Sequence, residues 1–424
     1  MRRKASSSWD AVLLTCLALV LIVLSQINPI AIFVRTGQAG PYPISMQYLP
    51  LVMKEPTPTP NPTPTPVPPT PTPTPFPSRM QSPEYGFHVF IWWDPITRER
   101  DLMLVKEAGF TWIKQTFAWK DIEGAGKGIF DWSCADQVVD DALRYGLSIM
   151  ARVDHQPNWA RSGCSQQGPP NNYQDYADFL FALASRYKGR IRAYQIWNEP
   201  NLADNWCNQS PDPKNYVKLL KKAYQAIKQA DPNAMVISAG LAPTTRWDRV
   251  AVPDVVFLQR MYDAGAKPYF DVLGAHGAGY KAPPEMDPGE VARNPNFYNV
   301  GDVNCPGDLC RIYCFRHVED VRQIMVQNGD GDKQVAVVEF GWTSDQRPNS
   351  PYHWHAVSEE EKADYLVGAY QWAKQNWLPW VGVMSAIYIA DPRWTPDNEQ
   401  YWWAVTYPDG TTRLAYDRLR AMPK

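Results

Sequence analysis

Residues 191–201 read IRAYQIWNEPN, an apolar run that ends in the polar sequence Asn198-Glu199-Pro200-Asn201. A polar linker and an amphipathic segment at 213–230 follow, so this part of the chain has the pattern of a β-strand, a turn and a helix. The same unit recurs from residue 79 to the carboxyl terminus. Short β-rich runs that alternate with helical segments predict a parallel sheet covered by helices.

Eight such units can be placed between residues 79 and 424. The expected strands are 86–92, 111–117, 147–153, 191–197, 235–239, 272–276, 335–340 and 384–389, and the expected helices are 98–108, 135–145, 173–187, 213–230, 254–264, 316–328, 359–376 and 414–421. Eight strand and helix units predict an α/β fold of the (β/α)8 TIM-barrel type as one domain, 79–424. An open doubly wound sheet is the alternative, but no Gly-rich phosphate loop follows the first strand.

The first 78 residues have a different composition. Basic residues at 2–4 precede an apolar run at 11–24 that weakens towards residue 34, so we expect 1–34 to be a transmembrane anchor or a signal peptide cleaved near residues 37–39. Both an anchor and a signal peptide predict export of the catalytic domain. An anchor would hold this domain at the outer surface of the membrane, and a cleaved signal peptide would leave it secreted. A short segment, 35–54, connects this run to 55–78, a Pro-Thr alternation that predicts a disordered polyproline stalk.

Charge and motifs exclude several classes of function. The net charge is −2 and the only basic block is at 2–4, so the chain lacks the positive surface that nucleic-acid phosphates require. No Gly-x-Ser-x-Gly elbow and no Walker loop is present, which argues against serine hydrolases and phosphoryl transfer. The 18 Trp and 22 Tyr side chains suit a core, and they also suit stacking on sugar rings.

Cys16 lies inside the apolar run, and the other six of the seven cysteines follow it. Export would place these six in an oxidising compartment, where disulfides can form. The other six allow 15 pairings in principle. Cys164 and Cys207 each follow a predicted strand end, so they are the preferred disulfide. Three cysteines crowd the segment 305–314, but their spacing lacks the close pair that zinc sites usually have.

Two glutamates mark the expected active site, which in such barrels lies at the carboxyl ends of the strands. Glu199 follows the fourth strand, and Glu339 lies in the apolar run that forms the seventh. Either residue alone could be an ordinary loop charge, but an unpaired charge within an apolar strand is costly. Two carboxylates at one barrel mouth suit glycoside cleavage, in which one donates a proton and the other attacks the anomeric carbon.

The region from about residue 84 to residue 424 resembles clan A of the glycoside hydrolases. Asn198-Glu199-Pro200 is similar to the clan's acid/base motif, and 338–342, VEFGW, is similar to its nucleophile motif. The segments FAWKDIE at 117–123 and FDW at 130–132 are similar to families 39 and 5 of the cellulase-like group. The resemblance implies a retaining hydrolase of β-linked glycosides, with Glu199 as acid/base and Glu339 as nucleophile.

The resemblance also implies which side chains contact the substrate. Asn198 would bind the sugar 2-hydroxyl, and His276 and Tyr280 would take the clan's usual His and Tyr places, with Tyr280 or a neighbour steadying Glu339. One departure is that Lys114 stands where many members have an arginine, although Arg152 could substitute. The remaining candidates for contact with sugars are His155, Trp92, Trp93, Trp119, Trp342, Trp402 and Trp403, of which we expect one of the last two to form the floor.

We expect no cofactor and no metal, an oligo- or polysaccharide as the partner, a monomer, and contact with the membrane only through an uncleaved amino terminus. A carbohydrate-binding barrel that has lost catalysis is the alternative from another class. A transglycosylase that uses the same carboxylate pair is a nearer alternative. The sugar, the linkage and the choice between internal and terminal cleavage are left open by the sequence.

Overall fold

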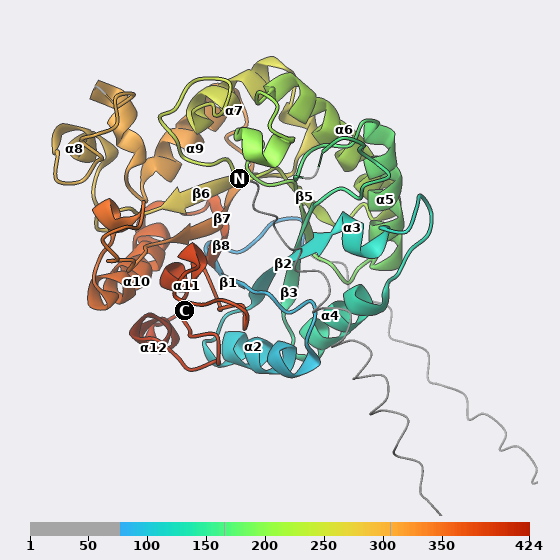
Figure 1. The fold of residues 1–424 in the computed structure, drawn as a ribbon, viewed down its shortest axis with the longest axis horizontal. Helices are drawn as coiled ribbons and strands as arrows, with labels where there is room; N and C mark the ends of the chain where they lie inside the picture. Colours follow the sequence, from blue (N-terminus) through green and yellow to red (C-terminus); the bar gives the residue numbers. More distant parts are fainter. Residues whose placement is uncertain (1–76, 165, 306) are drawn as a thin grey trace, which may run out of the picture. The chain divides into compact units, whose positions relative to one another are not determined.

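The computed structural model describes residues 77–164, 166–305 and 307–424 (Figure 1). The expected anchor at 1–34, the connecting segment 35–54 and all but the last two residues of the expected stalk at 55–78 lie outside these residues. Within the described part of the chain, no helix combines the length and the apolar character that crossing a bilayer requires.

Eight parallel strands close into a barrel around which the helices form a ring (Figure 1). Each strand pairs with the next in the sequence, and β8 pairs with β1 to complete the circle. The strands are β1 Glu84–His88, β2 Trp112–Ala118, β3 Ser148–Asp154, β4 Ala193–Ile196, β5 Met235–Ile237, β6 Val272–Ala278, β7 Gln334–Gly341 and β8 Val381–Ala386. The predicted (β/α)8 barrel is therefore confirmed.

The long helices lie where the sequence predicts them. They are α2 Pro95–Glu107, α4 Ser133–Arg144, α5 Tyr173–Arg186, α6 Pro213–Ala230, α7 Asp254–Asp263, α9 His317–Gln327, α10 Glu359–Asn376 and α12 Leu414–Ala421. Short helical turns decorate the connections: α3 Trp119–Ile122, η1 Ala203–Trp206, η2 Lys267–Tyr269, α8 Pro288–Arg293, η3 Gly307–Ile312, η4 His353–His355 and α11 Glu399–Trp403. The start of α2 precedes the expected residue 98, because the Asp94 side chain accepts from Ile96 N and Pro95 fits the first helical turn.

Two strands have bounds that differ from the predicted ones in a way that bears on the site. β1 ends at His88 rather than residue 92, and β8 occupies 381–386 rather than 384–389. The apolar pattern misleads at both places, since Val89, Ile91 and Ile389 stay buried after their strands have ended. His88 and Tyr388 consequently stand at the carboxyl ends of strands, where the barrel opens.

The amino end of the barrel is closed by a plug of side chains. Met80 packs there against Trp112 and Met150, and its backbone N–H donates to the Gln334 side chain over 2.9 Å. Beneath them, Arg192 donates to both carboxylate oxygens of Glu84, at 2.9 and 3.1 Å. Among the described residues, side chains thus fill the amino end of the barrel, and the cavity lies at the carboxyl ends of the strands.

A smaller core stabilises the connection between β6 and α9, which contains α8 and projects from the barrel (Figure 1). Ala282, Val291 and Tyr313 pack together there, next to a disulfide between Cys305 and Cys310. A second disulfide joins Cys164 to Cys207, which confirms the pairing preferred from the sequence.

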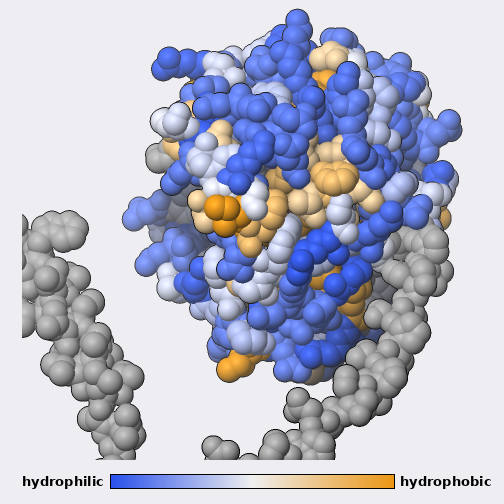
Figure 2. Space-filling view, turned by 90° about the vertical axis from the view of Figure 1, so that its right-hand side faces the viewer, coloured by the Kyte–Doolittle hydropathy of each residue, from blue (hydrophilic) through white to orange (hydrophobic). Residues whose placement is uncertain are grey.

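Figure 2 looks at the side of the barrel where α5 and α6 lie in Figure 1, and that side is largely hydrophilic with a small apolar area. The largest apolar side chain that α5 leaves exposed is Phe181, at 41%. This position is on the outer helical ring, away from the carboxyl ends of the strands.

Candidate active site

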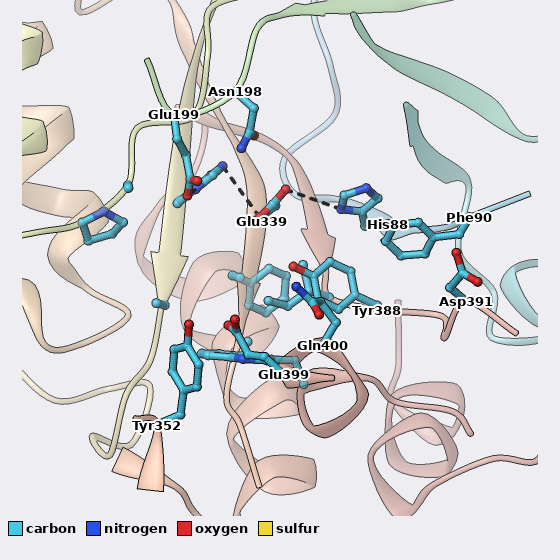
Figure 3. A pocket seen from close by; sticks show the side chains of 18 of the residues that line it. His88, Phe90, Asn198, Glu199, Glu339, Tyr352, Tyr388, Asp391, Glu399 and Gln400 are labelled. Carbon is cyan, nitrogen blue, oxygen red and sulfur yellow. Dashed lines mark hydrogen bonds and ion pairs between the residues drawn. The ribbon is translucent and has the colours of Figure 1, made fainter. Parts of the chain in front are cut away.

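A cavity of about 750 Å³ opens at the carboxyl ends of the strands, and Figure 3 shows it from close by. Its side chains come from both halves of the barrel. They include His88 and Phe90 after β1, Arg152 of β3, Asn198 and Glu199 after β4, His276 of β6, Glu339 of β7, Tyr388 after β8, and Glu399, Gln400 and Trp403 of α11. The two glutamates singled out in the sequence therefore line one cavity.

Glu199 is placed by an unusual turn after β4. Trp197 and Glu199 have positive φ values of 68° and 45°, a conformation that costs non-glycine residues on the order of 1–3 kcal/mol each. The turn is held because Glu199 N donates to Gly240 O over 3.0 Å and Trp197 Nε1 donates to Asn205 O over 3.0 Å. Because of this turn, the side chains of Asn198 and Glu199 point into the cavity.

The Glu199 carboxylate receives two further contacts. Asn205 Nδ2, from η1, donates to Glu199 Oε2 over 3.3 Å, and His276 Nδ1 lies 3.0 Å from Glu199 Oε1. Cys207 follows η1 directly and is tied to Cys164 by the disulfide. The disulfide therefore fixes the short helix that contributes a hydrogen bond to Glu199.

Glu339 is surrounded by nitrogen atoms. Lys114 Nζ donates to its Oε1 over 2.6 Å, His88 Nδ1 lies 3.5 Å away, Arg152 Nη1 lies 3.9 Å away, and His276 Nε2 lies 4.0 Å from Oε2. Burial by itself would raise the pKa of Glu339, but Lys114, then His276 and His88, hold that pKa well below its usual range. Glu339 is therefore an ionised carboxylate at any ordinary pH.

The neighbours of Glu339 differ in charge. Burial, followed by the charge of Lys114, lowers the pKa of His88 to about 4, so His88 is neutral near pH 7. Burial also lowers the pKa of Lys114 to about 8, against the opposing effect of Glu339, so this amine is mainly protonated at pH 7. Arg152 is shared with Asp154, to which its Nε donates over 2.6 Å.

His276 lies between the two glutamates and contacts both through its two ring nitrogens. Its ring packs against Gly240, where a Cβ atom would come within 2.3 Å of the imidazole. Glycine is required at this position for that reason. One imidazole thus links the carboxylate after β4 to the carboxylate of β7.

The structure brings most of the predicted site residues together. Asn198, Glu199, His276, Tyr280, Glu339 and Trp403 all line the cavity. Tyr280 is in the cavity wall, but its hydroxyl donates to Pro243 O at 3.3 Å. The expected support of Glu339 by Tyr280 is therefore corrected, because Lys114 occupies that place.

Three predicted substrate contacts are corrected. Trp119 and Trp342 are fully buried, and their indole N–H groups donate to Glu123 and to Ala282 O. Trp402 lies outside the cavity, where its indole N–H donates to Pro396 O over 3.0 Å. Of the two tryptophans considered for the floor, only Trp403 lines the cavity. The spacing of the tryptophans in the sequence does not show which of them lie in the core and which line the cavity.

A second, smaller cavity of about 340 Å³ contains the other predicted aromatic contacts. Trp92, Trp93 and His155 line it, together with Phe90 and Arg393, which also line the first cavity. His155 has a positive φ of 58°, and its Nδ1 lies 2.5 Å from Asp154. His155 is therefore a wall residue of this adjoining cavity.

Sequence reasoning missed several cavity residues. His88 and Tyr388 fall inside the predicted strands 86–92 and 384–389. In the structure β1 ends at His88 and β8 ends at Ala386, so both residues lie at the opening of the barrel. Glu399 and Gln400 precede the Trp402-Trp403 pair by a few residues, and acidic or amide side chains beside two tryptophans after the last strand were an available signal. Burial raises the pKa of Glu399, which makes it a third carboxyl group in the cavity.

Comparison with known proteins agrees with this geometry. Residues 72–264 match the family model described as cellulase (glycosyl hydrolase family 5). The matched segment includes Glu199 and the turn after β4 that places it. A β-xylosidase of Caldicellulosiruptor saccharolyticus is 30% identical to this chain over 122 residues, which cover 25% of this chain and 24% of that protein.

Solved structures show the same barrel. A family 39 glycoside hydrolase from Bacteroides cellulosilyticus WH2 has a TM-score of 0.57 and 20% identity, over 80% of this chain and 63% of that one. A monomeric β-xylosidase from Caulobacter crescentus CB15 has a TM-score of 0.58 and 17% identity, over 81% and 69% of the two chains. The chain thus spans about a quarter of this curated relative and less than two thirds of the Bacteroides enzyme.

Proposed function

We propose that this protein is a retaining O-glycoside hydrolase that cleaves β-linked glycosides or polysaccharides by double displacement. The observation that carries the proposal is the single imidazole of His276, which lies 3.0 Å from the Glu199 carboxylate and 4.0 Å from that of Glu339. The two carboxylates, which come from the ends of the non-adjacent strands β4 and β7, thereby line one sugar-sized space. This arrangement suits a reaction that needs one acid and one nucleophile.

In the first step Glu339 attacks the anomeric carbon while Glu199 gives its proton to the departing glycosidic oxygen. The bond to the leaving group breaks as the bond to Glu339 forms, so the sugar becomes an ester of the enzyme. In the second step Glu199 takes a proton from water, whose oxygen displaces Glu339 from the same carbon. The contacts of Glu339 with Lys114 and Arg152 support its role as the ionised nucleophile.

Several polar groups in the cavity wall are available to bind sugar hydroxyls. His276 Nε2, His355 Nδ1 and Trp403 Nε1 are buried without a hydrogen-bond partner among the described residues, and all three residues line the cavity. Buried polar groups of this kind normally have partners. We assign them, with Asn198, to the hydroxyl groups of the bound sugar.

The proposal includes export and tethering through the amino-terminal apolar run at 11–24, with a monomeric barrel outside the cell. The basic residues before the run and the Pro-Thr repeat after it support this location. Fractionation of cells, with the protein detected in the membrane, the medium or the cytosol, tests it. Recovery in the cytosol would contradict it.

Activity is tested by measuring reducing-sugar release from xylan, mannan, β-glucan and a bacterial exopolysaccharide, with the anomers of fresh products followed by NMR. We expect release of β-anomers by the wild type and none by Glu339→Gln, whose fold is checked by circular dichroism. Binding without release by the wild type would support the non-catalytic carbohydrate-binding alternative. Products longer than the substrate would support the transglycosylase alternative, and α-anomers would contradict retention.

A further inference from the structure

An aromatic groove of about 440 Å³ lies on the outer helical ring, between α9 and α10 (Figure 1). Trp372 of α10 and two tryptophans that follow this helix, Trp377 and Trp380, line it, and the facing side chains come from α9. We call it the α9–α10 groove. It shares no described lining residue with the catalytic cavity, so the proposed mechanism leaves its purpose unexplained.

The aromatic rings of the α9–α10 groove are held in fixed positions. Glu319 Oε1 accepts from the indole N–H groups of Trp372 and Trp377, at 3.1 and 2.8 Å. Trp377 stacks on Phe315 at 4.8 Å and lies 5.1 Å from Trp380. Trp377 is buried, whereas Trp372 and Trp380 are only partly buried. Two rigid rings therefore present part of their surface to solvent.

The two arginines of the groove are engaged within the protein. Arg316 lies over Trp372, 4.4 Å from the ring centre, and donates to both carboxylate oxygens of Glu319, at 3.0 and 2.9 Å. Arg322 donates to Lys333 O over 2.8 Å. The groove thus presents mainly ring surface, and Val326 beside it is 50% exposed.

The chain enters the barrel at the edge of this groove. Arg79 donates to Pro379 O over 3.1 Å, and Pro379 directly precedes Trp380. Burial lowers the pKa of Arg322, and the like charge of Arg79 lowers this pKa further, so the two guanidinium groups are near each other. The residues that precede Arg79 therefore start beside the tryptophans.

The sequence before this entry point has the composition that an aromatic groove binds. Residues 70–76 read TPTPTPF, which is uncharged and has a proline at every second position as far as residue 75. Proline-rich segments favour the polyproline II helix and bind to grooves lined by aromatic rings, because the stiff chain has little entropy to lose. Polyproline II makes no internal hydrogen bonds, and the exposed amides of Gln323 and Asn376 in the groove can bind its free carbonyl groups.

The length of the segment also suits the groove. Seven residues of polyproline II span about 20 Å. Trp372 is four residues before Asn376, the last residue of α10, which corresponds to about 6 Å of helix. A chain that starts beside Trp380 can therefore reach Trp372.

We propose that residues 70–76 bind in the α9–α10 groove, with their prolines on Trp372 and Trp380. A groove of this volume fits one extended segment, whereas a stable contact between whole proteins buries about 1,200–2,000 Å². Attachment at Arg79 gives the segment an effective concentration in the millimolar range, so weak affinity is sufficient for occupancy. The contact fixes the direction in which the expected stalk joins the barrel.

The first test uses the full chain in detergent, labelled with 5-fluorotryptophan and observed by ¹⁹F NMR. The signals of Trp372 and Trp380 are identified by their loss in Trp372→Phe and Trp380→Phe. The wild type is compared with a triple variant, Pro71→Ser, Pro73→Ser and Pro75→Ser, which keeps the length and charge of the segment and leaves the barrel sequence intact. We expect both signals to shift in the triple variant.

Trp247 supplies the matched control signal, because it is an exposed tryptophan, at 56%, in the connection between β5 and α7. Its signal should have the same position in both proteins. Identical positions of the Trp372 and Trp380 signals in the wild type and the triple variant would overturn the proposal.

The second test is a titration with the peptide TPTPTPF, blocked at both ends and followed by calorimetry, which needs no tryptophan variant. The peptide should bind the triple variant with a Kd below about 1 mM, the affinity that occupancy by a short tether requires. It should bind the wild type severalfold more weakly, because the chain's own segment competes. The peptide TSTSTSF is the control and should bind neither protein.

Two outcomes of the titration would contradict the proposal. Equal affinity of TPTPTPF for the wild type and the triple variant would mean that the groove is empty in the wild type, and no binding to the triple variant would mean that the groove does not accept this sequence. A wild-type ¹⁹F spectrum that approaches that of the triple variant on dilution would assign the groove to the segment of a second copy instead. Neither test depends on glycosidase activity.

Discussion

Lys114 Nζ lies 2.6 Å from Glu339 Oε1, a contact that crosses the barrel interior from β2 to β7. The lysine side chain is fully buried, so water does not compete for the carboxylate on that side. A lysine offers a point charge on a flexible stem, whereas the arginine expected from the resemblance would offer a planar fork. The strongest of the effects that lower the pKa of Glu339 therefore comes from this one short contact.

Replacing Lys114 by Met should move the acidic limb of the pH profile upwards. Without this cation, the effect of burial on the pKa of Glu339 is opposed only by the remaining neighbours, so that pKa rises. Glu339 is then protonated at a higher pH, and on the acidic limb kcat/KM should fall about tenfold for each unit by which this pKa rises. Lys114→Arg, which keeps the charge, should retain the limb near its original position. An unchanged limb in Lys114→Met would refute the role of this contact.

Replacing Glu199 by Ala should lower kcat by about 10²–10⁴-fold on substrates with poor leaving groups, the usual contribution of a positioned acid. Dinitrophenyl glycosides need little protonation of their leaving oxygen, so formation of the enzyme ester should be nearly preserved for them. Added azide can then attack the ester without a general base and should give the β-glycosyl azide, identified by NMR. An α-azide, or equal losses on both classes of leaving group, would count against Glu199 as acid/base.

α11 is held in place by a buried charge cluster outside the cavity. Lys362 of α10 donates to the carbonyls of Trp402 and Ala404, each at 3.1 Å, and to Glu359 at 3.2 Å. Arg413 donates to the same glutamate over 2.9 Å. The Lys362 side chain is fully buried, and the segment it binds is the one that brings Glu399, Gln400 and Trp403 to the cavity.

Replacing Lys362 by Met should therefore loosen α11 and raise KM severalfold more than it lowers kcat, because Glu199 and Glu339 lie on other elements. Loss of the hydrogen bonds of the buried ammonium group should also reduce the free energy of unfolding by about 1–3 kcal/mol. Lys374→Met, on an exposed turn of the same helix, serves as the control and should change neither quantity. A fall in kcat with KM unchanged would show that Lys362 does not act through α11.

His317, at the start of α9, should make stability depend on pH. Its Nε2 lies 2.8 Å from Asp254 and its Nδ1 3.1 Å from Asp320. Burial opposes the charge, but the two aspartates raise the pKa of His317 to about 10 from 6.5. A raised pKa in the folded state stabilises the protein fully below pH 6.5, and this stabilisation is lost as the pH rises through about 10.

Urea unfolding of the wild type and His317→Gln at pH 6, 8 and 10 measures this contribution. The variant should be less stable by about 3 kcal/mol at pH 6, the cost of breaking a buried pair. The difference between the two proteins should shrink towards pH 10. A difference that is the same at all three values would mean that His317 is not the titrating group.

The sequence was sufficient for the barrel and for the two glutamates that line the cavity, because both follow from local patterns. Each strand and helix unit has its own periodicity, and a glutamate at a strand end is visible without knowledge of the neighbours. His88 and Tyr388 were not predicted, because Val89 and Ile389 continue the apolar pattern beyond the ends of β1 and β8. A buried residue after a strand looks the same in sequence as a residue within it.

Contacts across the barrel were beyond local patterns. The pairing of Lys114 with Glu339 joins positions more than two hundred residues apart, and only the closed sheet brings them together. The same is true of the tryptophans, since Trp119 and Trp403 differ in function only through what packs against them. The Cys164–Cys207 disulfide was predictable because both residues follow neighbouring strands.

The plug at Met80 also determines how the molecule can meet a large substrate. The chain joins the barrel at the sealed end, where Arg79 donates to Pro379 O, while the catalytic cavity opens at the other pole. If the residues before Arg79 tether the protein as proposed, their attachment point lies at the pole opposite the opening. A long polymer can then reach the cavity without crossing the place where the chain enters the barrel.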